Sequence, residues 1–144
     1  MTSKPGYLLD VNALIALGDR DHVHHQLVLR WFQTPDLDWG VCAFTEAGFL
    51  RISTNPRLGS HTAKGAAAVL ADLAARPGYR YWPTTTSWIT LTTPFRDRIF
   101  GHQQINDALL LGLAVKENGV LVTMDKAVRS LAGARLAHHV LVLS

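Results

Sequence analysis

Short apolar runs, each bounded by turn-forming or capping residues, recur along the chain and predict buried β-strands. The runs cover residues 6–9, 39–43, 79–82, 120–123 and 140–143. Polar and apolar residues do not alternate within these runs, so we expect both faces of each strand to be covered, as in a parallel sheet. The pattern therefore predicts a central, mainly parallel sheet of about five strands.

Between the apolar runs, hydrophobic residues recur at helical spacing. The stretches with this spacing are 12–17, 22–33, 45–53, 62–75, 105–118 and 126–131. Alternating strands and helices favour a three-layer α/β/α fold with right-handed crossovers. The segment 84–101 mixes loop, strand and helix signals, and we expect an irregular connection there with one short helix near residues 95–100.

The composition fits one globular domain. A length of 144 residues predicts a single domain over residues 1–144, and contents of 48% hydrophobic and 17% charged residues exclude disorder and a coiled coil. No apolar stretch approaches the roughly 18 residues of a membrane span, and the N-terminus lacks a signal-peptide pattern. We therefore expect a soluble cytoplasmic protein. The single cysteine, Cys42, lies in an apolar run and is expected in the core.

Aspartates stand at the ends of predicted strands and at the start of a predicted helix. Asp10 ends the first strand, Asp125 follows the run 120–123, and Asp107 opens the long apolar helix. Each of them alone fits a helix-capping role. As a group they are harder to explain, because in open α/β sheets the carboxyl ends of the strands form the edge where ligands bind.

Glu46 is the fourth acid, one of only two glutamates in the chain, and it lies in an apolar stretch after the second predicted strand. A capping arrangement with Thr45 as N-cap explains Glu46 equally well when it is taken alone. Clustered carboxylates, however, repel one another and raise one another's pKa unless a cation compensates. Carboxylates with few His or Cys partners favour Mg²⁺ or Mn²⁺, so the acids together predict a site for a divalent cation.

Four ordered segments resemble the acidic motifs of PIN-domain ribonucleases and, more narrowly, of VapC toxins from toxin–antitoxin pairs. The segments are LLDVNALI (8–15), TEAGFLR (45–51), NDALL (106–110) and VTMD (122–125). The resemblance implies that Asp10, Glu46, Asp107 and Asp125 bind one or two Mg²⁺ or Mn²⁺ ions and cleave single-stranded regions of RNA. The implied products are a 5′-phosphate and a 3′-hydroxyl. The implied partners are the RNA substrate, a VapB-like antitoxin and a second copy in a homodimer.

The resemblance also suggests individual roles. Asn12 and Thr123 match polar positions that support the family's acids. Asp10 and Asp107 are expected to be direct metal ligands, whereas Glu46 and Asp125 could bind the metal, hold its waters or help to deprotonate the nucleophile. The sequence does not separate these last three roles.

Basic and aromatic residues outside the acidic motifs are weaker candidates. Arg96, Arg98 and His102, with Gln103, flank the irregular segment and could contact RNA phosphates, although a solvated surface explains them equally well. Among the tryptophans, Trp88 alone is a candidate for base stacking. Arg51 lies five positions after Glu46, about 140° away on a helix, so a salt bridge or a partner contact is favoured over a catalytic role.

Other functional classes fit less well. His22, His24 and His25 with Asp21 suggest zinc, but positions at the start of a helix explain these histidines better. A receiver domain needs an adjacent acid pair after the first strand, and a haloacid-dehalogenase-like phosphatase needs an aspartate at the position of Asn12. The alternative that stays open is a catalytically silent PIN-like module that binds RNA or protein. The net charge of +3 suits either function.

Overall fold

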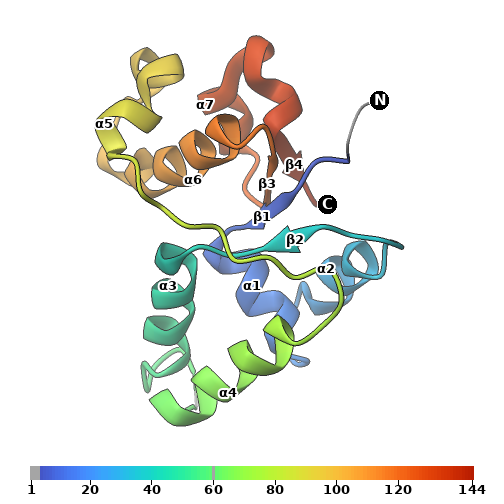
Figure 1. Ribbon diagram of the computed structural model, residues 1–144. Coiled ribbons are helices and arrows are strands. Elements are labelled where there is room, and N and C mark those ends of the chain that lie inside the picture. The colour runs from blue at the N-terminus through green and yellow to red at the C-terminus, as the bar shows by residue number, and fades with distance from the viewer. Residues whose placement is uncertain (1–3, 60) are drawn as a thin grey trace.

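The computed structural model describes residues 4–59 and 61–144. Within them, four strands form one parallel sheet in the order β2-β1-β3-β4 (Figure 1). The strands are Tyr7–Leu9 (β1), Trp39–Gly40 (β2), Val120–Thr123 (β3) and Val140–Val142 (β4). The chain passes from β1 to β2 on one side, whereas β3 pairs with the other side of β1. The order therefore reverses at β1, and the crevice between β1 and β3 is the expected ligand position in such a sheet.

The fifth expected strand, 79–82, pairs less fully than predicted. It makes only isolated parallel bridges, which join Trp39 to Tyr79 and Cys42 to Trp82. The second bridge lies beyond β2, which ends at Gly40, and involves Cys42, the N-cap of α3 (Ala43–Ser53). The Arg80 N–H still donates to the Trp39 carbonyl at 2.8 Å, and a Cβ on Gly40 would lie 1.7 Å from the Arg80 carbonyl oxygen. Glycine at position 40 thus permits this close approach.

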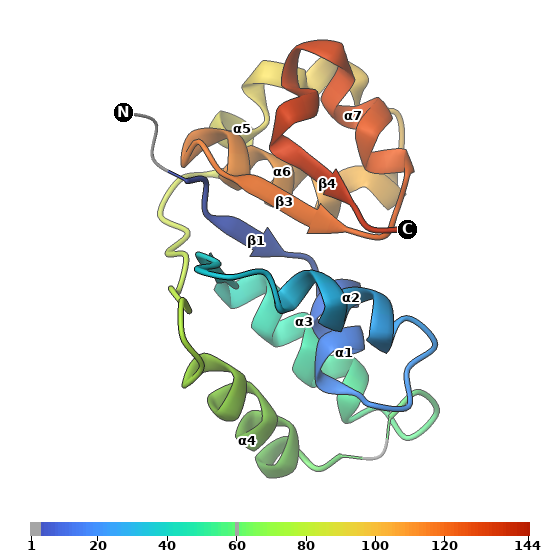
Figure 2. The ribbon, with the colours of Figure 1, turned by 90° about the vertical axis from the view of Figure 1, so that its right-hand side faces the viewer.

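Helices cover both faces of the sheet, as Figure 2 shows, so the predicted three-layer α/β fold is confirmed. One group consists of α1 (Val11–Gly18), α2 (His25–Phe32), α3 (Ala43–Ser53) and α4 (Ala63–Ala74). The other consists of α5 (Trp88–Leu91), α6 (Ile105–Lys116) and α7 (Ala127–Leu136). Neighbouring strand residues face opposite layers. Leu8 packs with α6 and α7, whereas Leu9 packs with α1. In the described part of the chain, no helix is both long and apolar enough to cross a bilayer.

Several element boundaries differ from those expected. Segment 84–101 contains two short helices, α5 and the 3₁₀ helix Thr93–Arg98, rather than one near 95–100. Helix α2 begins at His25 rather than at residue 22. Helix α7 continues past residue 131 through a break at Gly133, whose φ of 67° suits glycine. These differences lie at helix ends and breaks, where local sequence specifies structure least strongly.

The N-terminal cap of α3 is also not the one predicted. The helix begins at Ala43 with Cys42 as its N-cap, so Thr45 already lies in the first turn. Thr45 is fully buried, and its hydroxyl lies 3.2 Å from the Cys42 sulfur. Cys42 itself is a free, buried thiol, as expected. Thr45 is therefore a buried residue of the first helical turn and not the N-cap.

Candidate active site

The reversal point of the sheet brings three aspartates to one edge. Asp10 directly follows β1, Asp125 lies two residues after β3, and Asp107 lies in the first turn of α6. The Asp10 N–H donates to the Val122 carbonyl at 3.1 Å, which fixes the end of β1 against β3. These acids interact through their charges, because Asp10 and Asp125 both raise the pKa of Asp107.

Asp10 is a buried acid at the start of α1. Its side chain is the N-cap of the helix and accepts a hydrogen bond from the Ala13 N–H at 2.7 Å. Burial raises the pKa of Asp10, and the Asp125 charge raises it further, although hydrogen bonds from Thr123 and Ala13 act in the opposite direction. The expected capping role of Asp10 is confirmed, but capping alone leaves a desolvated carboxylate at the sheet edge.

Asp107 is half-buried, and its pKa is raised to about 6, first by desolvation and then by the charges of Asp10 and Asp125. Asp107 lies in the first turn of α6, where the positive end of the helix dipole favours a negatively charged side chain. Within residues 4–59 and 61–144, the ion pairs involve other acids, namely Asp72, Asp38 and Glu117. None of the three aspartates therefore forms an ion pair with a basic side chain of the described chain.

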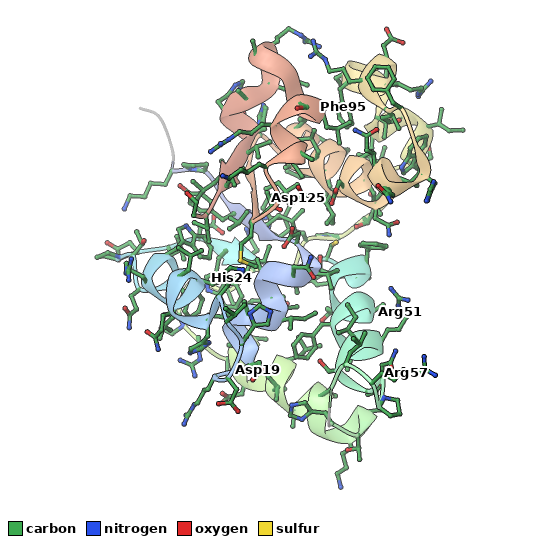
Figure 3. The ribbon with its side chains drawn as sticks, turned by 180° about the vertical axis from the view of Figure 1, so that it is seen from behind. Asp19, His24, Arg51, Arg57, Phe95 and Asp125 are labelled. Atoms are coloured by element: carbon green, nitrogen blue, oxygen red, sulfur yellow. The ribbon has the colours of Figure 1, made fainter. Side chains whose placement is uncertain are left out.

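Thr123 connects two of these acids. It is completely buried at the end of β3, and its hydroxyl both hydrogen-bonds Asp10 and accepts from the Asp125 N–H at 3.0 Å. Asp125 is exposed, and its Oδ1 accepts from the Ala127 N–H at 2.9 Å. Figure 3 shows Asp125 at the junction between the two groups of helices. One hydroxyl thus fixes a buried carboxylate and the backbone of an exposed one.

The donor set suits a hard divalent cation. In the described residues, no group of three or more His, Cys, Asp or Glu side chains is already arranged to enclose a metal ion. Mg²⁺ usually binds one or two carboxylates and keeps several waters, so an enclosed cage is not required. The mutual repulsion of Asp10, Asp107 and Asp125, without a basic partner among the described residues, is the feature that a cation would relieve.

A cavity of about 490 Å³ adjoins the aspartates, between α1, α3 and the start of α6. Asp10 and Asp107 form part of its wall. Its other polar lining residues are Asn12, Arg51, Gln103 and Asn106. The apolar part of the wall includes the half-buried ring of Phe44. The cavity therefore combines acids, carboxamides, an aromatic ring and one guanidinium.

Glu46 is not among the charges that shift the pKa of Asp10 or Asp107. It is not part of the cavity wall, and its charge acts instead on Tyr79, whose pKa is raised first by burial and then by Glu46. The cavity face of α3 is formed by Phe44, Ala47, Gly48, Arg51 and Ile52. A Cβ at Gly48 would lie 2.6 Å from the Val11 side chain, so α3 packs closely on α1 there. A catalytic role for Glu46 stays a prediction.

The basic residues proposed from the sequence to contact RNA have other neighbours. The Arg96 guanidinium donates to the Ile89 carbonyl, and that of Arg98 lies against the backbone break at Gly133. His102 is exposed at the start of the 3₁₀ helix His102–Gln104. None of these three basic side chains lines the cavity, whereas their neighbour Gln103 does. Their contact with RNA stays a prediction.

Trp88 and the histidines near the start of α2 make contacts within the protein. The Trp88 Nε1 donates to the Ile105 carbonyl at 3.1 Å, and the ring packs against the core on the α6 side. The His25 Nδ1 lies 2.7 Å from the Ala16 carbonyl, and the His22 Nδ1 accepts from the His24 N–H at 3.0 Å. These contacts are those of packing and helix-start residues.

Arg51 is the residue whose place the sequence interpretation missed. The sequence interpretation judged Arg51 by its angle from Glu46 on the helix. That angle was misleading, because Glu46 does not line the cavity. The informative spacing is to Phe44, Ala47 and Gly48, since residues three or four apart share one face of a helix. All of these residues line the cavity together. In the part of the chain that the structure describes, the expected salt bridge of Arg51 is not formed.

Comparison with known proteins identifies the family to which the chain is similar. Residues 7–134 match the model of the PIN domain family. Ribonuclease VapC39 of Mycobacterium tuberculosis is 40% identical over 132 residues, which cover 90% of this chain and 95% of the relative. Ribonuclease VapC44 of the same species is 37% identical over 135 residues, covering 91% and 95%. The fold resembles that of VapBC2 from Rickettsia felis, crystallised with a DNA fragment from its promoter, with a TM-score of 0.65, 15% identity, and 96% and 99% coverage.

Proposed function

The chain belongs to the PIN-domain family and, within it, to the VapC ribonucleases, and on this basis we propose that it hydrolyses phosphodiester bonds in single-stranded regions of RNA with Mg²⁺ or Mn²⁺. The observation that carries the proposal is the group Asp10, Asp107 and Asp125 at the reversal point of the sheet. Burial and the Asp125 charge raise the pKa of Asp10, burial and the charges of Asp10 and Asp125 raise the pKa of Asp107, and none of the three forms an ion pair among the described residues. We further propose that cleavage makes the protein the toxin of a toxin–antitoxin pair.

Asp10 and Asp107 would hold the cation, with Asp125 at the exposed edge of the site. A bound divalent cation lowers the pKa of a water and neutralises charge on the phosphoryl oxygens. Desolvation of Asp10 and Asp107 strengthens their attraction for a cation, because fewer waters screen the charges. The carboxylates also repel a bare phosphate, so the substrate approaches productively only when this negative charge is compensated.

The reaction requires a water to attack the phosphorus while the bond to the 3′ oxygen breaks. The attacking water loses a proton and the leaving 3′ oxygen gains one, which gives a 5′-phosphate and a 3′-hydroxyl. Asp125 is the exposed acid of the group, and Oδ1 is the oxygen that accepts from Ala127. We assign its other oxygen to holding the water or accepting its proton. Thr123 keeps Asp10 and the Asp125 backbone in place during this step.

Protein partners form a second part of the proposal. A VapB-like antitoxin is supported by the VapBC2 complex of Rickettsia felis, to which the fold is similar. A homodimer is supported by apolar side chains on α5 and around the start of α6, where Ile89, Phe100 and Ile105 are 66%, 86% and 41% exposed. Neighbouring exposed apolar residues are typical of protein interfaces. We expect this surface to be covered by protein.

We also propose that residues 1–144 act as a single PIN-like domain. The family model spans residues 7–134, and the same sheet separates both core clusters of the described chain. Asn12 lines the cavity beside Asp10 and is assigned to support of the acids. A cytoplasmic location would follow from an RNA substrate, since translation takes place there.

The experiment that tests the activity is cleavage of total RNA by the purified protein. Reactions contain Mg²⁺, Mn²⁺ or EDTA, and new 5′ ends are mapped for the wild type and for Asp10→Asn. We expect discrete, metal-dependent ends that disappear in the variant. Wild-type protein that binds RNA but cuts none with either metal would contradict the proposal and favour the silent RNA-binding module.

A further inference from the structure

Arg51 is a positive side chain in the wall of the same cavity as Asp10 and Asp107. It lies in the last turn of α3 and is exposed. Within residues 4–59 and 61–144, its guanidinium makes no hydrogen bond and no ion pair, although carboxylates line the same cavity. Its N–H donors are therefore available to a molecule that enters the cavity.

Three arginines on the α5 to α7 side, Arg96, Arg98 and Arg135, differ from Arg51 in this respect. Arg96 donates to the Ile89 carbonyl, Arg98 lies against Gly133, and Arg135 donates to the Pro94 carbonyl at 2.8 Å. These contacts attach the 3₁₀ helix Thr93–Arg98 to its neighbours, so the three guanidinium groups already have partners within the protein. Arg51 is the arginine in the cavity wall.

The remaining cavity wall indicates what would bind there. The carboxamides of Asn12, Gln103 and Asn106 offer both donors and acceptors, and Phe44 offers an aromatic face. Unpaired RNA bases are recognised by such hydrogen bonds to their edges and by stacking on aromatic rings. A planar guanidinium matches two phosphate oxygens at once. An acidic peptide would offer carboxylates to Arg51 but no flat base to stack on Phe44.

We infer that this cavity binds one unpaired nucleotide next to the scissile bond, and that Arg51 donates hydrogen bonds to a phosphate of that nucleotide. The inference rests on the proposed ribonuclease function and names a substrate contact for it. Arg51 lines the cavity from α3 and Asp107 lines it from α6, so a phosphate bound by Arg51 would share the cavity with the acids. Arg51 is then a substrate-binding residue of the site.

The test measures RNA binding separately from cleavage. A single-stranded RNA oligonucleotide is titrated with Asp10→Asn protein, which is expected not to cut it. The oligonucleotide contains the mapped cleavage site, or has a mixed sequence if the wild type cuts no RNA. Arg51→Gln and Arg51→Lys are added to this background, and Arg57→Gln is the control. Figure 3 shows Arg51 and Arg57 on the same side of the molecule, but Arg57 does not line the cavity. Each glutamine variant removes one positive charge, so both variants should weaken the non-specific electrostatic attraction of RNA equally.

We expect Arg51→Gln to weaken binding about tenfold or more, as for a lost hydrogen bond to a charged group. Arg51→Lys keeps the charge but not the planar fork, so it should be intermediate. Arg57→Gln should change affinity by less than about threefold. Equal losses for Arg51→Gln and Arg57→Gln would show a general charge effect and overturn the inference, as would no loss for Arg51→Gln.

A second readout locates the contact. Methylphosphonate is placed at one phosphate at a time in the oligonucleotide, which removes that phosphate's charge. Protein with Arg51 should lose affinity most at one position beside the scissile bond, whereas the Arg51→Gln protein should lose no more there than elsewhere. Identical profiles for the two proteins would overturn the inference. Thermal unfolding of each variant confirms that the exposed substitution leaves the fold intact.

The outcomes also separate this inference from the function on which it rests. If the wild type cuts RNA and Asp10→Asn does not, but Arg51→Gln binds normally, the ribonuclease stands and the nucleotide contact fails. If Arg51 and the methylphosphonate are coupled but the wild type cuts nothing, the binding site stands and the nuclease fails. If Arg51→Gln weakens capture of a VapB-like antitoxin and leaves RNA affinity unchanged, the cavity serves a protein partner instead.

Discussion

At the residue scale, Thr123 shows how a small side chain supports the acids. Its hydroxyl hydrogen-bonds Asp10 and accepts from the Asp125 N–H at 3.0 Å. We predict that Thr123→Val lowers kcat about 10- to 100-fold, the usual effect of removing a group that orients metal ligands. The fold should survive, because valine has nearly the same shape. Single-turnover cleavage and urea unfolding of the same preparation check this, and Thr123→Ser should recover most of the activity.

The contribution of Glu46 can be separated from that of the aspartates. Because its charge acts on Tyr79 and it does not line the cavity, Glu46→Gln should lose less than about tenfold in kcat/KM. Asp10→Asn should lose at least about a hundredfold under the same conditions. Parallel cleavage assays with one RNA decide the matter. Equal losses would mean that Glu46 turns into the site when substrate and metal bind.

The raised pKa of Asp107 gives a prediction about the metal-free protein. Its pKa rises from 3.8 to about 6 on folding, so between these pH values the folded state binds more protons than the unfolded state. Stability therefore falls as pH rises through this window, and the penalty is complete above about pH 6. In EDTA, Asp107→Asn should be more stable than the wild type at pH 8, by on the order of 1 kcal/mol after screening. The difference should vanish below about pH 4. Urea titrations across pH measure it, and a difference that stays constant with pH would show that the Asp107 charge is not its cause.

The residues of the site differ in how far the sequence could place them. Asp10, Asp107 and Asp125 were predictable because two follow strands and the third opens a helix, and parallel strands align their carboxyl ends. The orientation of α3 was not predictable from the sequence, because it depends on the packing of Gly48 against Val11 in α1. Gly48 and Val11 both line the cavity, as does Arg51, whereas Glu46 does not.

At the element scale, the edge of the sheet beyond β2 depends on a close approach of two backbones. The sequence predicted a full strand at 79–82, but this segment makes only isolated bridges, the last of them to Cys42 directly before α3. No local pattern reveals this, because the bridges join segments far apart in the chain. The irregular segment 84–101 was likewise unpredictable, since its short helices are held by contacts such as that of Arg135 with the Pro94 carbonyl at 2.8 Å.

The glycine at this edge can be tested directly. Gly40→Ala should destabilise the protein by about 1–3 kcal/mol, because the new Cβ would lie 1.7 Å from the Arg80 carbonyl oxygen and the backbones must separate. Gly101→Ala is the control, since a Cβ there meets nothing within 4 Å. Urea unfolding of both variants measures the effect. Equal stability of Gly40→Ala and the wild type would mean that residues 79–82 can move away without cost.

At the scale of the whole molecule, the acidic edge lies where the two groups of helices meet. β1 separates the two core clusters, with Leu8 in one and Leu9 in the other, and Asp10 follows directly. Repulsion among the aspartates therefore acts on the centre of the fold rather than on a loose surface loop. A cation that binds the folded state alone should stabilise the entire chain against unfolding.

We accordingly predict that Mg²⁺ or Mn²⁺ raises the free energy of unfolding, by about 2.7 kcal/mol at a hundred times the dissociation constant. Asp10→Asn should abolish most of this gain, because it removes a carboxylate from the proposed metal site. Asp72→Asn should keep the gain, since Asp72 is an exposed residue on α4 whose pairing with Arg76 contributes little. Urea titrations at increasing metal concentration, with no RNA present, measure all three proteins. An identical gain in wild type and Asp10→Asn would place the cation elsewhere, because linkage requires the lost ligand to reduce stabilisation in proportion to the lost affinity.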